Sequence, residues 1–395
     1  MWMLILEYKI VATKKQHQAI EEAIRTTQFV RNKCLRYWMD SKKEDKVNKF
    51  ELNKYSTVLR NEFKFVKDLN SMAVQSAAER AWSAISRFFE NCKSKNPGKK
   101  GFPRFQKDNR SVEYKTSGWK LHKTKRRIAF TDKKGIGELK LLGKWDIHSY
   151  PVKVIKRVRL VRRADGYYCQ FSFNVDSSQQ LDKTGNQVGL DVGLEYFYSD
   201  SNGNHVDNPR FLPKAEKDIK RVQRRIYKHK KGSNRRRKSC KVYARKHLRV
   251  TRQRTEFAKR LALTLLQSND LVAYEDLKVK NMVRNHRFAK SINDVAWSEF
   301  RQWIEYFAHK YGRQAIAVKP HNTSQFCSSC GVKVRKDLKV RTHRCECGCV
   351  LQRDVNAAIN ILARATGGHP GSNAQGVETS TLLGETLVEQ VLTMN

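Results

Sequence analysis

The sequence has few acidic residues for its length. Its 395 residues include 38 Asp and Glu but 80 Lys and Arg, which gives a formal net charge of +42. A chain with this imbalance repels itself unless a polyanion neutralises it. Because phosphate contacts supply most non-specific nucleic-acid affinity, this charge favours a nucleic-acid partner. An anionic membrane surface is the alternative.

Long apolar runs are also lacking. No run of about 18 apolar residues occurs, and the apolar start at residues 1–6 is too short for a membrane span or a signal peptide. We therefore expect no membrane partner and a cytoplasmic, nucleoid-associated location. The hydrophobic content of 39% is adequate for globular folding, and the length predicts two or more domains.

The first half is predicted to be β-rich with a helical insertion near residues 16–95. Apolar residues recur at helical spacing around residues 30–38 and 78–89. Cys169, Phe171 and Phe173 then alternate with polar residues, as in a half-buried strand, and Asp165-Gly166 before them indicates a hairpin turn. The polar segment 181–187 is a plausible boundary.

The second half is predicted to alternate strands and helices, which indicates an α/β core. Strands are expected at 188–194, 271–274 and 314–319, with helices at about 295–311 and after residue 353. Residues 210–260 carry 22 Lys and Arg but three acids, and Gly232 suggests a turn between two basic helices there. The tail from about 366 is expected to be disordered or loosely docked.

Asp191 lies between two glycines in the predicted strand 188–194. Alternation along a strand places Gly189, Asp191 and Gly193 on one face, opposite Val188 and Leu190. An acid between two glycines leaves space for a large group, such as a metal ion bound to a phosphate. The alternative is that the glycines mark a turn or bulge and that Asp191 is a solvated loop acid.

Two further acids lie at the ends of predicted elements. Glu275 follows the apolar run 271–274, where a helix cap or a solvated terminal acid is the alternative; Asp276 would point to the opposite face and is the second choice. Asp354 begins the last helix, where the helix dipole alone favours an acid. Because phosphodiester cleavage with two hard cations needs carboxylates from several segments, Asp191, Glu275 and Asp354 form a coherent set.

The nine cysteines include two close pairs, Cys327/Cys330 and Cys345/Cys347. In a basic chain without a signal peptide, this pattern favours a metal site over disulfides. Four thiolates suit a structural, tetrahedral zinc ion, because no coordination position is left open for water. Unpaired buried cysteines are the alternative, and Cys349 could replace Cys347 as the fourth ligand.

These motifs together resemble the TnpB family of insertion-sequence-encoded nucleases, which is similar to the compact type V CRISPR effectors. The matching segments occur in order through the second half, at 189–193, 274–277, 322–331, 345–348 and 353–360. The first half matches more loosely, through its helix placement and the loop that ends at Phe105. The resemblance covers about residues 1–365. Gln352 departs from it where the family often has an acid, and Cys349 where an aliphatic residue is common.

The resemblance implies a multidomain α+β fold. Residues 1–15 and 96–182 would form a β-barrel wedge, interrupted by a helical recognition insert at 16–95. Residues 186–325 and 350–365 would form an RNase H-like (RuvC) nuclease core that contains the basic helices 210–260. Residues 326–349 would form an inserted zinc ribbon, and 366–395 the disordered tail.

The resemblance also implies an RNA-guided DNA endonuclease of a mobile element. A guide RNA would pair with one strand of a double-stranded DNA target, while the protein reads a short motif beside it. By position, Asp191, Glu275 and Asp354 become the catalytic acids that bind Mg²⁺. The structural Zn²⁺ ligands become Cys327, Cys330, Cys345 and Cys347.

Two other functions are weighed against this one. A catalytically silent, RNA-guided DNA-binding regulator would have lost a catalytic acid, and all three acids are present. A strand-joining transposase would need a nucleophile such as tyrosine, and no distinctive tyrosine motif occurs. A role as a transposition accessory protein stays open, and the sequence sets no oligomeric state.

Overall fold

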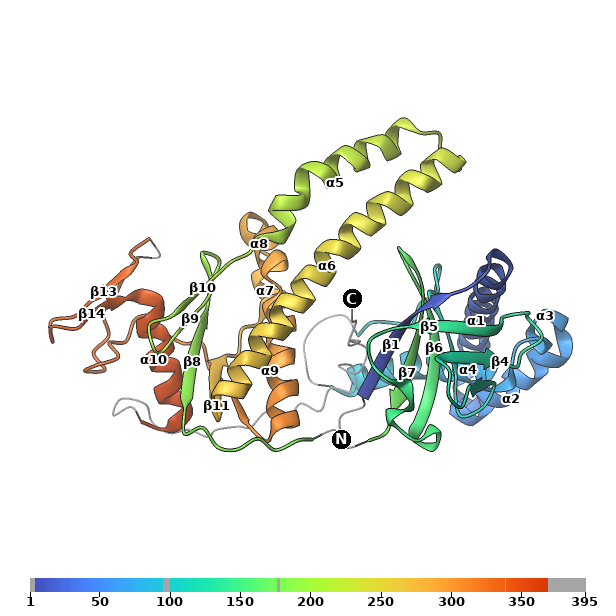
Figure 1. Cartoon of the computed structure of the whole chain (residues 1–395), viewed down its shortest axis with the longest axis horizontal. Helices are drawn as coiled ribbons and strands as arrows, with labels where there is room; N and C mark the ends of the chain where they lie inside the picture. The colour runs from blue at the N-terminus through green and yellow to red at the C-terminus, as the bar shows by residue number, and fades with distance from the viewer. Residues whose placement is uncertain (1–3, 95–99, 176–177, 338, 369–395) are drawn as a thin grey trace. The chain divides into compact units, whose positions relative to one another are not determined.

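The computed structural model describes residues 4–94, 100–175, 178–337 and 339–368 (Figure 1). The chain divides near residue 176 into two compact units, each described here by itself. None of the helices within the described ranges is long and apolar enough to cross a membrane. The predicted tail lies outside the described residues from residue 369 onward.

The first unit is built on a seven-stranded antiparallel sheet in the order β2-β6-β7-β1-β5-β4-β3. Its strands are β1 (Leu4–Val11), β2 (Ser111–Tyr114), β3 (Trp119–Leu121), β4 (Arg127–Phe130), β5 (Gly137–Leu142), β6 (Ile155–Arg163) and β7 (Gly166–Phe173). Arg163 pairs with Gly166 across a tight turn, so the predicted hairpin is confirmed. Cys169, Phe171 and Phe173 of β7 are buried, as their alternation predicts.

Four helices lie between β1 and β2: α1 (Lys14–Asp40), α2 (Lys49–Glu62), α3 (Lys64–Lys67) and α4 (Ser71–Lys93). The first begins two residues earlier than the predicted insertion, because Thr13 and Gln16 form a capping box. The Thr13 hydroxyl accepts from the Gln16 N–H at 3.3 Å, and the Gln16 side chain accepts from the Thr13 N–H at 2.9 Å. Ile20, Ile24 and Ile85 then join the sheet in one hydrophobic core.

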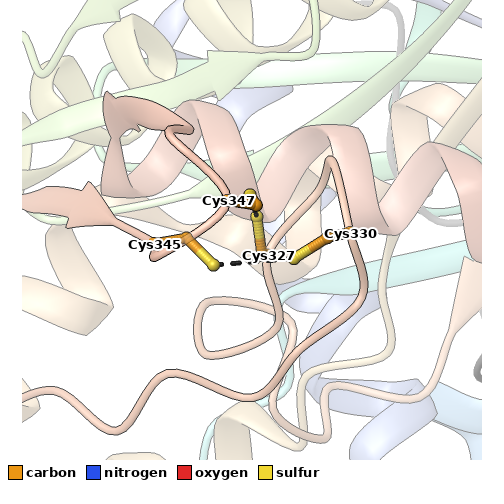
Figure 2. A group of neighbouring side chains, drawn as sticks. All are labelled: Cys327, Cys330, Cys345 and Cys347. Atoms are coloured by element: carbon orange, nitrogen blue, oxygen red, sulfur yellow. Dashed lines mark hydrogen bonds between the residues drawn. The ribbon is translucent and has the colours of Figure 1, made fainter.

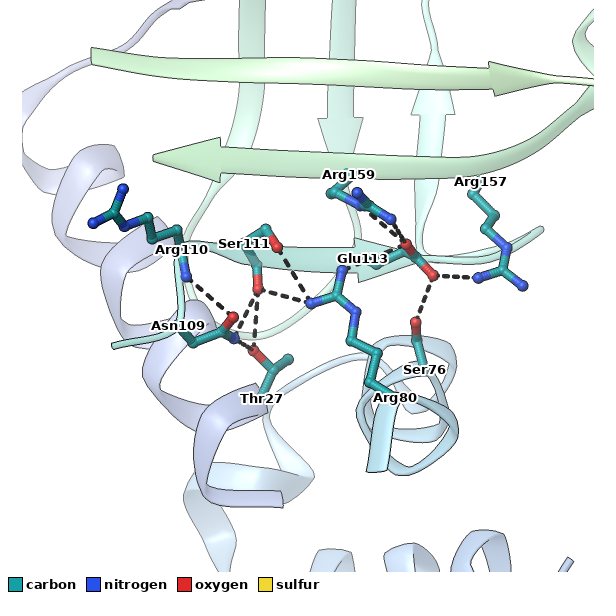
Figure 3. Close-up of polar contacts among 9 residues, drawn as sticks. All are labelled: Thr27, Ser76, Arg80, Asn109, Arg110, Ser111, Glu113, Arg157 and Arg159. Atoms are coloured by element: carbon teal, nitrogen blue, oxygen red, sulfur yellow. Dashed lines mark hydrogen bonds and ion pairs between the residues drawn. The ribbon is translucent and has the colours of Figure 1, made fainter. Parts of the chain in front are cut away.

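Glu113 of β2 ties α4 to this sheet (Figure 3). Its carboxylate accepts hydrogen bonds from Ser76 of α4 at 2.8 Å and from Arg157 and Arg159 of β6 at 2.7 Å each, and Arg80 of α4 lies at 3.4 Å. Burial raises the pKa of Glu113, but the charges of Arg80, Arg159 and Arg157 outweigh burial and lower the pKa to about 2. The buried carboxylate is therefore ionised and holds helix and sheet together.

The second unit contains a five-stranded mixed sheet in the order β10-β9-β8-β11-β12. Its strands are β8 (Gln187–Val192), β9 (Tyr196–Asp200), β10 (His205–Asp207), β11 (Leu271–Glu275) and β12 (Gln314–Val318). The strands β8, β11 and β12 run parallel, whereas β9 and β10 are antiparallel neighbours. Parallel neighbours need long crossovers, and helices fill both crossovers, so the predicted alternation is confirmed.

The helices of this unit form two layers around the sheet. They are α5 (Phe211–Lys228), α6 (Asn234–Ser268), α7 (Val279–Met282), α8 (His286–Val295), α9 (Trp297–Tyr311) and α10 (Arg353–Thr366). On one face, the Phe197 ring of β9 contacts Phe257 of α6 and Phe300 of α9, with centroids 5.0 and 4.9 Å away. On the other face, Ile361 of α10 packs with Ala273 in a small core.

A short two-stranded sheet precedes α10. Its strands β13 (Thr342–Arg344) and β14 (Val350–Gln352) pair antiparallel, and the last cysteines lie in the turn between them. Because α10 starts directly after β14, the cysteine segment and the last predicted acid share one continuous stretch of chain.

Candidate active site and metal site

The two neighbouring parallel strands β8 and β11 bring Asp191 and Glu275 together. Their register pairs Gly189 with Ala273 and Leu190 with Tyr274, so Asp191 and Glu275 are the next residues along the two strands. In-register residues on adjacent parallel strands point to the same face, about 4.8 Å apart along the hydrogen-bonding direction. That face is the one covered by α10.

Gly189 has a different role from the one expected. A Cβ atom added there would lie 2.1 Å from the Ala358 carbonyl oxygen and 2.9 Å from Leu362, so the glycine lets α10 approach β8 closely. At Gly193, an added Cβ would lie 3.0 Å from the Tyr196 carbonyl oxygen. The prediction of space for a bound group is therefore wrong at Gly189, where the backbone of α10 occupies that space.

Asp354 lies in the first turn of α10 but does not cap it. The cap is Gln352, whose side-chain oxygen accepts from the backbone N–H groups of Asp354 and Val355 at 3.0 Å each. The Asp354 carboxylate is 3.9 Å from Arg341. Asp354 is also one helical turn before Ala358, on the face that packs against β8. Asp354 is therefore not the N-cap residue of α10, although it lies in the first turn, where the helix dipole favours an acid.

The negative charges of Glu275 and Asp354 act on Asp191. Burial raises the pKa of Asp191 well above its usual range, and the negative charges of Glu275 and Asp354 raise it further, while Arg353 lowers it. As whole residues, all three keep part of their surface exposed to solvent. Among the described residues, these carboxylates do not form a set within 4.8 Å, whereas the cysteines do. Two metal ions that lie about 3.5–4 Å apart would need ligand atoms spread over a larger distance than the ligand atoms of a single ion.

Glu275 has a dedicated hydrogen-bond donor. The Thr323 hydroxyl donates to its carboxylate. Burial raises the pKa of Glu275, while the Thr323 hydrogen bond and the charge of Arg364 lower it. The adjacent Asp276, the second choice from the sequence, is exposed and forms an ion pair with Arg301. Asp276 is therefore engaged away from the acid cluster.

Four cysteines gather at the second site (Figure 2). The Sγ atoms of Cys327, Cys330, Cys345 and Cys347 all lie within 4.8 Å of one another. The Cys327–Cys347 and Cys330–Cys345 sulfur distances are 3.7 and 3.5 Å. Tetrahedral zinc with bonds of about 2.3 Å would hold its sulfur ligands about 3.8 Å apart. The cluster could therefore bind a metal ion such as zinc.

Backbone N–H groups favour the thiolate at Cys327. Burial raises the pKa of this thiol, but the N–H groups of Cys330 and Ser329, with His343 and Cys347, lower it to about 5. Cys349 belongs to a different set of potential ligands, because its sulfur lies within 4.8 Å of the Cys327 sulfur and a ring nitrogen of the buried His343.

The helices α5 and α6 form a strongly basic hairpin, residues 211–268 (Figure 1). Ile219, Val222 and Ile226 are buried, as their spacing predicts. The three acids of this segment are already paired: Glu216 with Lys220, Asp218 with Lys246, and Glu256 with Arg260. Most of its positive charge is therefore not neutralised within the segment.

The chain matches two family models. Residues 170–286 match OrfB_IS605, described as "Probable transposase", and residues 297–361 match "Cas12f1-like, TNB domain". A Streptomyces pristinaespiralis protein named "Putative RNA-guided DNA endonuclease" is 28% identical over 364 residues, 90% of this chain and 88% of the relative. A mimivirus protein named "TnpB-like protein L79" is 26% identical over 210 residues, 49% of this chain and 40% of the relative. The resemblance to the TnpB family is confirmed.

A solved structure of "the mini-RNA-guided endonuclease CRISPR-Cas_phi3" shares the fold. It aligns with a TM-score of 0.54 and 10% identity, over 94% of this TnpB-like chain and 93% of that one. The residues of the two candidate sites are distributed between the two family matches. Asp191 and Glu275 lie in the OrfB_IS605 match, whereas Asp354 and all nine residues from Thr323 to Gly331 lie in the TNB match.

Sequence reasoning missed the residues that hold the acids in place. Thr323 lies inside the segment 322–331 that carries the TnpB resemblance, but nothing in its spacing indicates a partner 48 positions earlier. Gln352 stands out in the sequence only as a departure from the family pattern. The signal that could have identified its role is the sequence pattern of a helix start, in which Gln352 occupies the N-cap position.

Proposed function

We propose that this chain is an RNA-guided, divalent-metal-dependent DNA endonuclease of the TnpB type. The observation that carries the proposal is the electrostatic coupling of Asp191 to Glu275 and Asp354, which come from three separate segments. A carboxylate whose pKa is raised by burial and by neighbouring acids, as that of Asp191 is, is costly to keep ionised unless cations neutralise it. RNA guidance follows from the names of the relatives.

The fold supports a finer division of the chain. The proposed RNase H-like nuclease core comprises residues 186–325 and 350–365. Strand β8 is the central strand of its sheet, and the acids lie beside α10. Residues 326–349 form a zinc ribbon. Residues 1–15 and 96–182 form the β-barrel wedge, and 16–95 the helical recognition insert.

The acids suit Mg²⁺, a hard cation that prefers carboxylate oxygens. When bound, two such ions would activate a water and stabilise the leaving 3′ oxygen. Asp191, Glu275 and Asp354 would hold these ions, and Asp191 is the acid whose pKa both of the others raise. Thr323 orients Glu275, and the Gln352 cap fixes the helix turn that carries Asp354.

The four cysteines Cys327, Cys330, Cys345 and Cys347 are the proposed ligands of one structural Zn²⁺. Their two measured sulfur distances fit the edges of a tetrahedral site, and all four positions are filled by protein. Zinc would fix the hairpin between β13 and β14, which leads directly into Asp354.

The basic hairpin 211–268 is proposed to bind the phosphate backbones of guide RNA and double-stranded DNA. The loop 93–107 would add contacts, although residues 95–99 lie outside the described part of the chain. Phe102 and Phe105 of this loop are exposed, and the Arg36 guanidinium lies 5.0 Å from the Phe105 ring centroid. Exposed aromatic rings beside cations suit unpaired bases.

The test is plasmid cleavage by the purified ribonucleoprotein in Mg²⁺, after sequencing the RNA that co-purifies with it. Asp191→Asn should reduce the cleavage rate at least about 100-fold, since metal ions contribute several kcal/mol to such reactions. Asp276→Asn is the matched control and should cut at nearly the normal rate, because its carboxylate pairs with Arg301.

Three results would contradict the proposal. Undiminished cutting by Asp191→Asn would overturn the active-site assignment. Target binding without nicking by the unmodified protein in Mg²⁺ would favour the silent regulator. Random cellular RNA instead of one discrete species would reduce the proposal to general binding by a basic surface.

A further inference from the structure

The turn before the first cysteine pair reaches back to the acid cluster. Thr323 is buried, with 5% of its surface exposed, and its hydroxyl donates to Oε1 of Glu275. Within the described part of the chain, no other side chain hydrogen-bonds to this carboxylate. A single, buried hydroxyl therefore sets the rotation of the Glu275 carboxylate.

Thr323 is itself held from α10. The side-chain amide of Asn360, which is fully buried, donates to the Thr323 carbonyl at 2.8 Å and to the Phe326 carbonyl at 2.7 Å. Both carbonyls belong to one turn, in which the N–H groups of Gln325 and Phe326 bond to the Asn322 carbonyl at 3.0 and 3.1 Å. The turn is thus fixed on the helix that also carries Asp354.

We propose that Thr323 is a positioning residue for Glu275, and that Asn360 fixes Thr323, so that the turn 322–326 sets the metal affinity of the acid cluster. The proposal rests on the proposed nuclease function and deepens it. A hydroxyl that donates to one oxygen of a metal-binding carboxylate orients the other oxygen, and such supporting contacts change metal affinity or activity by about 10–100-fold.

The turn also joins the two metal sites. Its last residue, Phe326, precedes Cys327, and Asn356 of α10 donates to the same Phe326 carbonyl at 2.8 Å. A shift of the first cysteine pair would therefore move Thr323 and, through it, Glu275. Because Thr323 is buried and its hydroxyl is directed at Glu275, its effect is expected on metal binding and not on recognition of the target.

The experiment compares Thr323→Val with Thr323→Ser in the ribonucleoprotein. Valine keeps the shape and removes the hydroxyl, whereas serine keeps the hydroxyl and removes a methyl group. Two quantities are measured: the Mg²⁺ concentration for half-maximal cleavage, and Mn²⁺ affinity by electron paramagnetic resonance titration. Zinc content and target binding are measured as controls for folding, and Thr323→Ala is a second hydroxyl-free variant.

Thr323→Val and Thr323→Ala should weaken Mn²⁺ binding and raise the Mg²⁺ requirement by about 10–100-fold, while Thr323→Ser stays near the unmodified protein. Zinc content and target binding should not change in any variant. Equal metal affinity for valine and threonine would overturn the proposal, and so would a serine variant as impaired as valine. Either result leaves the nuclease assignment intact, since that assignment is tested separately by cleavage with the unmodified protein and with Asp191→Asn.

Discussion

The Asn356 side chain of α10 accepts a hydrogen bond from the backbone N–H of Ser328 at 2.9 Å. The same side chain donates to the Phe326 carbonyl at 2.8 Å, so it spans Cys327, the first residue of the cysteine site. Asn356 is fully buried. Helix α10 therefore supports the cysteine site and carries Asp354 within the same helical turn.

Replacing this side chain should loosen the cysteine site. Asn356→Leu keeps the branched shape but leaves the backbone N–H of Ser328 without its partner, while the Phe326 carbonyl keeps its hydrogen bond from Asn360, so the cost should be about 1–3 kcal/mol of unfolding free energy. Zinc release to a chelator should become faster. The control is Asn293→Leu at an exposed position of α8, which should change neither quantity. Equal zinc release from both variants would contradict the role of Asn356.

The cysteine ligands are distinguished by single serine substitutions. Cys347→Ser should lower the zinc content of the purified protein, because the Cys347 sulfur lies with the other three sulfurs. Cys349→Ser should retain one zinc per chain, since Cys349 is grouped with Cys327 and His343 instead. The zinc content of each variant is measured by elemental mass spectrometry. The reverse pattern would make Cys349 the fourth ligand.

Glu113 should make the stability of the first unit depend on pH. Its folded-state pKa of about 2 lies below the ordinary value of 4.5, so its stabilisation is complete above pH 4.5 and is lost as the pH falls toward 2. The shift corresponds to about 3 kcal/mol. Glu113→Gln should therefore lower the unfolding free energy at pH 7, and the difference from the unmodified protein should shrink between pH 4.5 and 2.

The control for Glu113 is Glu138→Gln. Glu138 also pairs with an arginine, Arg127 at 2.6 Å, but both side chains are exposed. Exposed ion pairs contribute little, so this variant should unfold at nearly the normal denaturant concentration. A Glu113→Gln variant as stable as Glu138→Gln at pH 7 would show that the arginine cluster does not stabilise the fold.

Gly189→Ala should displace α10 from the sheet. The new Cβ would lie 2.1 Å from a backbone oxygen of α10, a contact that only movement of the helix can relieve. We expect a loss of about 3 kcal/mol in unfolding free energy, as for other overpacked cores, together with loss of cleavage. Gly368→Ala is the matched control, since its nearest contact is an ordinary 3.6 Å. Normal cleavage by Gly189→Ala would show that this helix contact does not set the acid cluster.

The basic hairpin should determine the salt dependence of RNA and DNA binding. Arg235, Arg237 and Lys238 are exposed near the turn of the hairpin. Replacing all three by glutamine should reduce the slope of log affinity against log salt by about 0.7–0.9 for each phosphate that is no longer neutralised. Replacing the two arginines by lysine keeps the charge and should leave the slope unchanged. An unchanged slope in the glutamine variant would exclude these residues from the interface.

Most of the elements, and the chemistry that their residues can offer, could be predicted from the order of the residues alone. The run Leu271–Glu275 forms a strand because its apolar side chains are buried on both faces, and the basic helices turn at Gly232 because glycine accepts the positive φ of 87°. The close spacing within each cysteine pair was visible in the sequence, whereas the meeting of the two pairs, with 3.7 Å between the sulfurs of Cys327 and Cys347, depends on the fold. The order of the motifs likewise sufficed for the family resemblance.

Contacts between distant segments could be seen only once the chain was folded. Gly189 makes room for Ala358, Gln352 caps the helix that carries Asp354, and Thr323 orients Glu275. The first and last of these contacts join residues far apart in sequence. Periodicity in the sequence indicates only which side chains lie on the same face of one helix or strand. Which helix covers that face, and how closely, depends on the packing of the whole second unit.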